Sequence, residues 1–230
     1  MVSTPVHTLE PSWPHPKSYY DGLYIGIDGL DGSGRSTLAL SIQTLLQSEG
    51  YPAVVVTPFP NLKTQKFIAQ VKHDRRLEMK SRHLLYASLF AIVTEHIILP
   101  HLTAGYVVLS DRSWISLYAR AVAQGLNDQW VRTTLGFALI PDIVLEPQAD
   151  PLSAARRKLM VTDALDPLES VSDRERLDGF IAFQRRVRDI LDQVKAVVPW
   201  HTLDLADGSN SLQAILPLLI SKMEGREVSS

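Results

Sequence analysis

The chain has 230 residues, of which 45% are hydrophobic and 21% are charged, so its length and composition are those of one ordinary or enlarged globular domain. A formal net charge of −2 argues against a strongly basic nucleic-acid-binding protein. The absence of cysteine excludes disulfides, thiolate catalysis, iron–sulfur clusters and Cys-ligated zinc. No window of about 18 residues is apolar and free of charge, as a transmembrane helix requires. We therefore expect a cytoplasmic protein without a membrane or nucleic-acid polymer as partner.

Short apolar runs alternate with helical patterns along the chain. Residues 1–21 carry several prolines but neither a basic start nor an apolar run, so they are predicted to form an extended arm rather than a secretory signal. The expected strands are 23–28, 53–57, 106–110, 142–145 and 201–205. The expected helices are 36–48, 62–73, 79–103 with a bend near Pro100, 115–138 with a break near Gly125, 174–197 and 211–224.

This alternation predicts an α/β fold with a parallel sheet of about five strands and helices on both faces. One three-layer domain is expected over residues 22–225. The segment 148–173 is polar and contains a basic cluster, and we interpret it as an inserted, irregular lid. In such folds ligands lie beyond the carboxyl ends of the strands, where the glycine loop and the acids described next are found.

The strongest motif is GLDGSGRST at residues 29–37, between a predicted strand and a predicted helix. It matches the phosphate-binding loop pattern G-x-x-x-x-G-K-[ST] except that Arg35 replaces the lysine. Glycines allow backbone N–H groups to turn toward phosphate oxygens, the helix adds its partial positive end, and the Ser36 hydroxyl suits Mg²⁺. The alternative is a glycine-rich turn that binds nothing. We expect the P-loop NTPase fold.

Three further residues follow strands near the loop. Asp111 is suited to orienting Mg²⁺, although an aspartate at this point also caps helices. Arg112 is placed either to reach an anionic substrate or to pair with Asp28. Asp28 is placed either to bind a substrate hydroxyl or a metal, or to cap a turn. In the polar segment, Arg156 and Arg157 either close over phosphates or form a solvated basic face.

The residues resemble the thymidylate kinase family of nucleoside monophosphate kinases from about Tyr24 to Val197. The matching elements, in chain order, are IGIDGLDGSGRST, VVVTPFPN, LLYASLFAIVTEHIILPHLTAG, YVVLSDRSWIS, PDIVL and ERLDGFIAFQRR. The order and spacing of these six elements are more specific than any one of them. The resemblance implies transfer of the ATP γ-phosphoryl group to a nucleoside monophosphate, with dTMP as the default acceptor, and dimerisation through long helices.

The resemblance also assigns roles to residues of this chain. It implies ATP and Mg²⁺ as the donor and its metal, with Mg²⁺ near Ser36 and Asp111. Catalytic roles fall to Arg35, Asp111, Arg112 and Asp28. Acceptor contacts fall to Phe59 and Arg112, and we add Phe90 and Arg120, which replace family residues in the acceptor pocket. The loop motif itself predicts donor contacts at Gly29, Asp31, Gly32, Ser33, Gly34, Arg35, Ser36 and Thr37, and the basic cluster of the polar segment adds Arg156 and Arg157.

The chain departs from the family at positions that read the thymine nucleotide. Leu89 and Phe90 stand where the family has Asp-Arg, and Ala119-Arg120-Ala121 replaces an A-Y-Q-like segment. A pocket that loses hydrogen-bonding groups loses discrimination, because buried base atoms are left unpaired. Two alternatives to dTMP kinase activity therefore remain open here. One is a kinase of the same fold acting on a non-thymine small molecule, and the other is a nucleotide-binding regulatory protein without useful turnover.

Overall fold

Five short strands form one parallel sheet with the order β2-β3-β1-β4-β5. The computed structural model describes residues 20–58, 62–73, 77–161, 176–205 and 209–227. The strands are β1 (Leu23–Ile27), β2 (Ala53–Val56), β3 (Val107–Asp111), β4 (Ile143–Pro147) and β5 (Trp200–Leu203). All five predicted strands are confirmed, with boundaries shifted by at most two residues.

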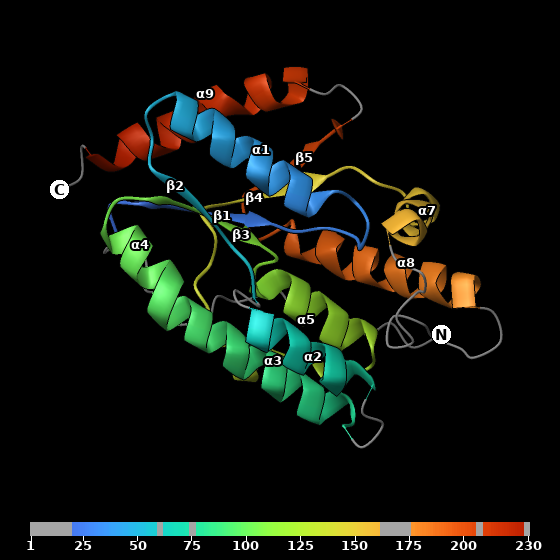
Figure 1. Ribbon diagram of the computed structural model, residues 1–230. Helices are drawn as coiled ribbons and strands as arrows, with labels where there is room; N and C mark the ends of the chain where they lie inside the picture. The colour runs from blue at the N-terminus through green and yellow to red at the C-terminus, as the bar shows by residue number, and fades with distance from the viewer. Residues whose placement is uncertain (1–19, 59–61, 74–76, 162–175, 206–208, 228–230) are drawn as a thin grey trace.

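Helices cover both faces of the sheet, as predicted (Figure 1). On one face, α1 (Arg35–Ser48) and α9 (Ser209–Glu227) pack on apolar residues of β1, β3 and β4, including Ile25, Leu109 and Leu145. The other face is covered by α3 (Met79–Val93), α5 (Trp114–Ala123), α6 (Asp128–Thr134) and α8 (Arg176–Val194). Because β1, β3 and β4 are buried between two helical layers, most of their side chains are apolar in succession rather than in alternation, whereas the edge strand β5 has exposed residues.

The long helix predicted over 79–103 is interrupted by one π-helical turn. It consists of α3, the π-helix η1 (Thr94–Ile98) and α4 (Leu99–Thr103). The Leu99 N–H donates to the Thr94 carbonyl, five residues back. Pro100 explains the change, because its ring clashes with the carbonyl four residues earlier and it has no N–H to donate.

The helical run Met79–Thr103 is also long and apolar enough to pass a length-and-hydropathy test for a membrane span, with a mean hydropathy of 1.4. Core helices of water-soluble proteins pass the same test. Here Ala87, Phe90 and Val93 are buried against the sheet. The run is therefore weak evidence for a membrane span.

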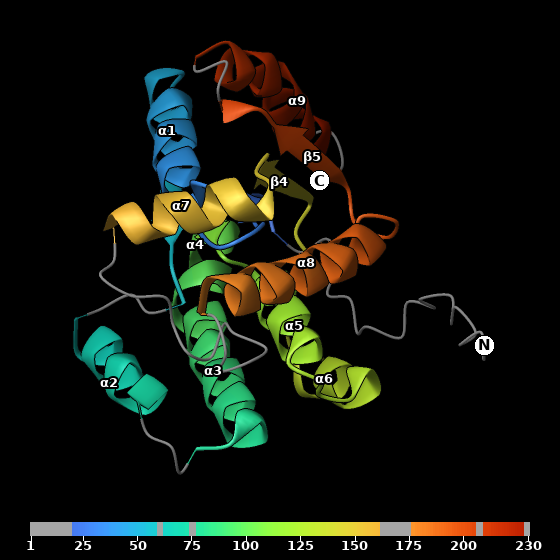
Figure 2. The ribbon, with the colours of Figure 1, turned by 90° about the vertical axis from the view of Figure 1, so that its right-hand side faces the viewer.

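Two further helices, one of them beside the glycine loop, complete the described part of the fold. α7 (Pro151–Val161) is a regular helix, so the expectation of an irregular segment is wrong over these residues. Figure 2 shows α7 crossing beside the start of α1, with α2 (Leu62–His73) next to α3. The remaining lid residues, 162–175, and the arm, 1–19, lie outside the described residues.

Candidate active site

The glycine loop lies at the carboxyl end of the central strand and leads directly into α1. The β1–β3 register places Ile27 beside Asp111, so residues that follow β1 meet residues that end β3. The N-cap residue of α1 is Gly34, in the left-handed region at φ 101°, and it has no side chain to cap the helix. The first N–H groups of α1 are therefore available to a ligand, and the helix dipole favours an anion there.

Helix α7 packs directly on the loop. A Cβ atom at Gly32 would clash with the Ala154 carbonyl oxygen, and the φ of Gly32 is +82°. Only glycine permits both the close approach and this backbone conformation. Arg157 Nη1 donates to the Ser33 carbonyl at 3.2 Å. Both arginines predicted for the lid have exposed side chains; Arg157 touches the loop, and the phosphate role of Arg156 stays a prediction.

Ser36 and Asp111 come together as the sequence predicted. The Ser36 hydroxyl donates to Asp111 Oδ2 at 2.6 Å. The other carboxylate oxygen, Asp111 Oδ1, is buried and has no hydrogen-bond partner among the described residues. A hydroxyl and one carboxylate fit Mg²⁺, which usually keeps several waters and uses one or two carboxylates together with substrate phosphates. Within the part of the chain that the structure describes, no group of three or more His, Cys, Asp or Glu side chains forms an all-protein metal cage.

Asp28 is fully buried and tied to the start of α5. Its Oδ1 accepts from the Ser113 N–H at 3.1 Å and the Ser116 hydroxyl at 2.5 Å, and its Oδ2 accepts from the Ser113 hydroxyl at 2.5 Å. Burial raises the pKa of Asp28 although these hydrogen bonds lower it. Asp28 therefore joins β1 to the first turn of α5, and its catalytic role stays a prediction.

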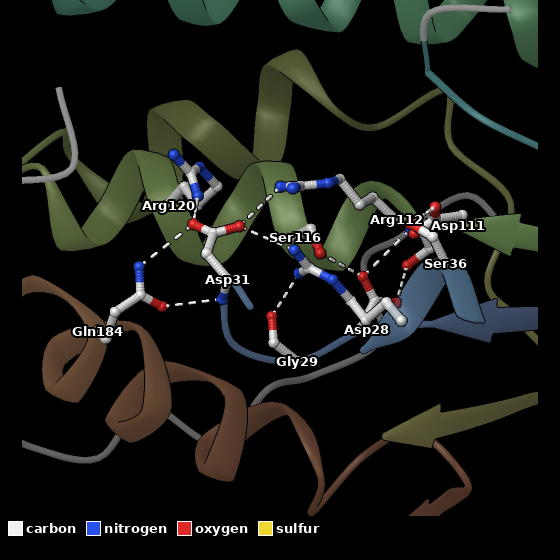
Figure 3. Close-up of polar contacts among 11 residues, drawn as sticks. Asp28, Gly29, Asp31, Ser36, Asp111, Arg112, Ser116, Arg120 and Gln184 are labelled. Atoms are coloured by element: carbon white, nitrogen blue, oxygen red, sulfur yellow. Dashed lines mark hydrogen bonds and ion pairs between the residues drawn. The ribbon is translucent and has the colours of Figure 1, made fainter. Parts of the chain in front are cut away.

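Asp31, within the loop, is the centre of a cationic cluster (Figure 3). Its Oδ1 lies 2.8 Å from Arg35 Nη2 and 3.0 Å from Arg112 Nη1, while its Oδ2 contacts Arg120 Nη1. Arg112 thus pairs with Asp31 rather than with Asp28. Burial raises the pKa of Asp31, but the three guanidinium groups outweigh it and hold that pKa well below its usual range.

Arg35 turns inward, toward its own loop. Its Nη1 donates to the Gly29 carbonyl at 2.5 Å and its Nη2 to Asp31, and its side chain is only 6% exposed. Burial lowers the pKa of this guanidinium, as does the neighbouring Arg112 charge. The planar fork of arginine explains how one side chain reaches both oxygens at once.

Two groups near the loop escaped the sequence analysis. Gln184 on α8 is fully buried, accepts from the Asp31 N–H at 3.1 Å and donates to Asp31 Oδ2 at 3.2 Å. Glu146 on β4 is buried beside Gly29 and pairs with Arg188 at 2.8 Å and Lys195 at 2.9 Å. Gln184 lies inside the quoted FIAFQRR element. Glu146 is an acid at a strand end, the same signal that identified Asp111.

The predicted acceptor residues lie in different surroundings. Phe90 is buried in the core on α3, with its ring centroid 6.3 Å from that of Phe137. Arg120 lies on α5 and reaches Asp31 as described above. Phe59 lies outside the described residues. The acceptor roles of Phe90 and Arg120 stay predictions.

A glycine loop between the central strand and a helix of a five-stranded parallel sheet, with a Ser–Asp pair beside it, is the arrangement of a P-loop nucleotide-binding protein. The model of the family described as thymidylate kinase matches residues 27–198. The chain therefore belongs to the thymidylate kinase family, and it is a nucleoside monophosphate kinase.

Individual relatives agree with this assignment. The chain is 28% identical over 217 residues to thymidylate kinase of Finegoldia magna, covering 90% of this chain and 100% of the relative. It is 30% identical over 183 residues to thymidylate kinase of Xanthomonas campestris, covering 74% and 76%. It is 28% identical over 181 residues to probable thymidylate kinase 2 of Saccharolobus solfataricus, covering 75% and 83%.

Proposed function

We propose that this chain transfers the γ-phosphoryl group of ATP to dTMP, giving ADP and dTDP. Family membership supports the reaction type, and the observation that carries the site assignment is the Ser36–Asp111 pair beside the uncapped start of α1. An oxygen of the acceptor phosphate attacks the γ-phosphorus while the bond from that phosphorus to the β–γ bridging oxygen breaks. No covalent enzyme intermediate is needed.

The donor phosphates are assigned to the loop and the first turn of α1. Backbone N–H groups of this turn have no side-chain cap at Gly34 and point along the helix dipole. Ser36 and Asp111 would hold Mg²⁺, which when bound neutralises charge on the β- and γ-phosphate oxygens. Arg157, which donates to the Ser33 carbonyl, brings a cation from α7 to this side of the loop.

We assign Arg35 mainly to holding the conformation of the glycine loop. Each of its terminal nitrogens donates within the loop, one to the Gly29 carbonyl and one to Asp31, so the guanidinium is held against the loop backbone. A buried guanidinium still contributes positive potential at the loop without direct contact. In this proposal Arg35 shapes the loop and supplies charge at a distance.

A second copy of this chain is the proposed partner for the exposed side of α3. Leu84 and Ile92 lie two turns apart on this helix and are 48% and 50% exposed, and the exposed residue between them is the small Ser88. Large apolar side chains separated by a small one on a long helix suit a helix-packing interface. We expect Ile92→Lys to convert a dimer into a monomer in analytical ultracentrifugation. Leu40→Lys is the matched control, because Leu40 is 56% exposed and lies on α1, which covers the opposite face of the sheet.

The test of the reaction is product formation from ATP and Mg²⁺ with dTMP, dUMP and other nucleoside monophosphates. We expect ADP and dTDP in equal amounts with dTMP, and a loss of about 100-fold or more in kcat for Asp111→Asn, because the metal would lose the carboxylate of the Ser36 pair. ATP-induced thermal stabilisation without ADP formation on any acceptor would contradict the proposal.

A further inference from the structure

Arg120 is held at the edge of the loop by an ion pair and a cation–π contact. Its Nη1 contacts Asp31 Oδ2, and its guanidinium carbon lies 5.6 Å from the Phe183 ring centroid. Gln184, the neighbour of Phe183, binds the same carboxylate oxygen at 3.2 Å. This packing positions the guanidinium before any ligand arrives, which lowers the entropic cost of binding.

The cluster around Asp31 carries excess positive charge. Three arginines against the Asp31 carboxylate leave a formal charge of +2, before the nearby Lys158 cation and the Asp28 and Asp111 carboxylates beside Arg35 are counted. Arg35 faces inward and is 6% exposed, whereas the Arg112 and Arg120 side chains are 39% and 22% exposed. A partly buried cluster with this excess charge favours a dianion as its ligand.

Arg112 and Arg120 reach the loop from elements other than the one that carries Arg157. Arg112 follows β3 and Arg120 lies nearly two turns into α5, whereas Arg157, which contacts the loop backbone, comes from α7. The loop is therefore flanked by cations from two separate parts of the fold, one of which is assigned above to the donor phosphates.

We propose that Arg120 binds the acceptor phosphate together with Arg112, so that this enzyme recognises its acceptor mainly by the phosphate dianion. This inference rests on the proposed function, because it assigns a ligand of the same site. Phosphate contacts dominate over base contacts because Arg120 is a cation, which suits a phosphate dianion, and Ala121 offers no side-chain donor to a base. Nucleoside monophosphates with different bases are then accepted with similar efficiency.

The test measures binding rather than turnover. Isothermal titration calorimetry with dTMP and thymidine separates the contribution of the phosphate to binding from that of the nucleoside. Titration with ATP separates effects on the acceptor from effects on the donor. Arg120→Gln is expected to raise the Kd of dTMP at least 10-fold, with changes below about 2-fold for thymidine and ATP. Arg120→Lys keeps the charge but loses the planar guanidinium. Its Kd for dTMP is expected to lie between that of the wild type and that of Arg120→Gln. Arg132→Gln is the matched control, because Arg132 is 20% exposed and pairs with Asp128.

Three results would overturn the inference. If Arg120→Gln weakens thymidine as much as dTMP, Arg120 contacts the nucleoside. If it weakens ATP as much as dTMP, its role is to hold the loop. A wild-type chain that forms dTDP while Arg120→Gln binds dTMP normally contradicts this inference alone. A wild-type chain that shows the expected binding pattern without forming dTDP contradicts only the proposed reaction.

Discussion

Two buried carboxylates beside the phosphate loop, Asp31 and Glu146, show how similar chemistry serves different purposes. Asp31 is 3% exposed and pairs with arginines from α1, from the turn after β3 and from α5. Glu146 is fully buried beside Gly29 and pairs with Arg188 and Lys195, from α8 and the turn that follows it. In both cases a buried charge is tolerated because several cations and hydrogen bonds compensate its desolvation.

The difference lies in what else binds the cations. Arg188 also donates to the Ala149 carbonyl at 2.7 Å, and Lys195 also pairs with Asp192 at 2.8 Å and lies over the Trp200 ring. Glu146 accepts from the Trp200 indole N–H at 3.0 Å as well. The Glu146 cluster therefore fastens α8 to β4 and β5. The Asp31 cluster instead leaves Arg112 and Arg120 partly exposed beside the loop.

Asp31→Asn is expected to have the largest effect of any single change in either cluster. It leaves three guanidinium groups without their shared anion, so we expect kcat to fall by about 100-fold or more and unfolding free energy to fall by about 3 kcal/mol. The exposed fractions of Arg112 and Arg120 keep this figure at the low end of the range for buried pairs. Phosphoryl-transfer assays and urea unfolding measure the two effects.

The same variant has a pH signature. The pKa of Asp31 is lower in the folded state, so the unfolded chain binds the proton more tightly. Its stabilising contribution is complete above the unfolded pKa of about 3.9 and is lost as pH falls toward the folded value. Asp31→Asn is expected to reduce the loss of unfolding free energy at acid pH. An unchanged loss in this variant would show that Asp31 is not the group responsible.

Arg35→Lys is expected to lower kcat by about 10-fold, a smaller loss than that of Asp31→Asn. A lysine ammonium cannot bridge the Gly29 carbonyl and the Asp31 carboxylate with two separate nitrogens as the guanidinium does. Steady-state kinetics with ATP and dTMP check this, and Lys158→Arg is a control for charge-conserving exchange on α7. A rise in kcat for Arg35→Lys would show that the arginine limits catalysis.

Glu146→Gln is expected to affect stability more than catalysis. Removing the negative charge leaves Arg188 and Lys195 beside a neutral amide, and we expect unfolding free energy to fall by about 2 kcal/mol, discounted because both cations are partly exposed. The kcat should stay within about 3-fold of the wild-type value. A large loss of kcat with normal stability would remove the distinction between the two clusters.

His83 supplies the smallest expected effect and lies away from both clusters. It is buried between α3 and α6, its Nε2 lies 2.7 Å from Thr134 Oγ1, and burial lowers its pKa. The unfolded chain therefore binds a proton more readily, so stability falls as pH decreases from about 6.5. His83→Gln is expected to remove about 1 kcal/mol of this pH dependence, measured as the difference in unfolding free energy between pH 7.5 and 5.5.

Most of the fold was predictable from the sequence because buried parallel strands leave short apolar runs. The meeting of Ser36 and Asp111 was predictable for the same reason, since the carboxyl ends of parallel strands share one edge. The pairing of Arg112 was not settled, because its side-chain direction depends on a left-handed turn at φ 78°. Gln184 was missed because no pattern in one sequence shows which face of α8 meets the loop.

A crystal structure of the chain with dTMP and a non-hydrolysable ATP analogue would test the contrast between the two clusters most directly. We predict the dTMP phosphate within hydrogen-bonding distance, about 3 Å, of the guanidinium nitrogens of both Arg112 and Arg120. The Glu146 cluster should keep its present contacts. A dTMP phosphate bound away from Arg120, with Arg120 still paired to Asp31, would contradict the account.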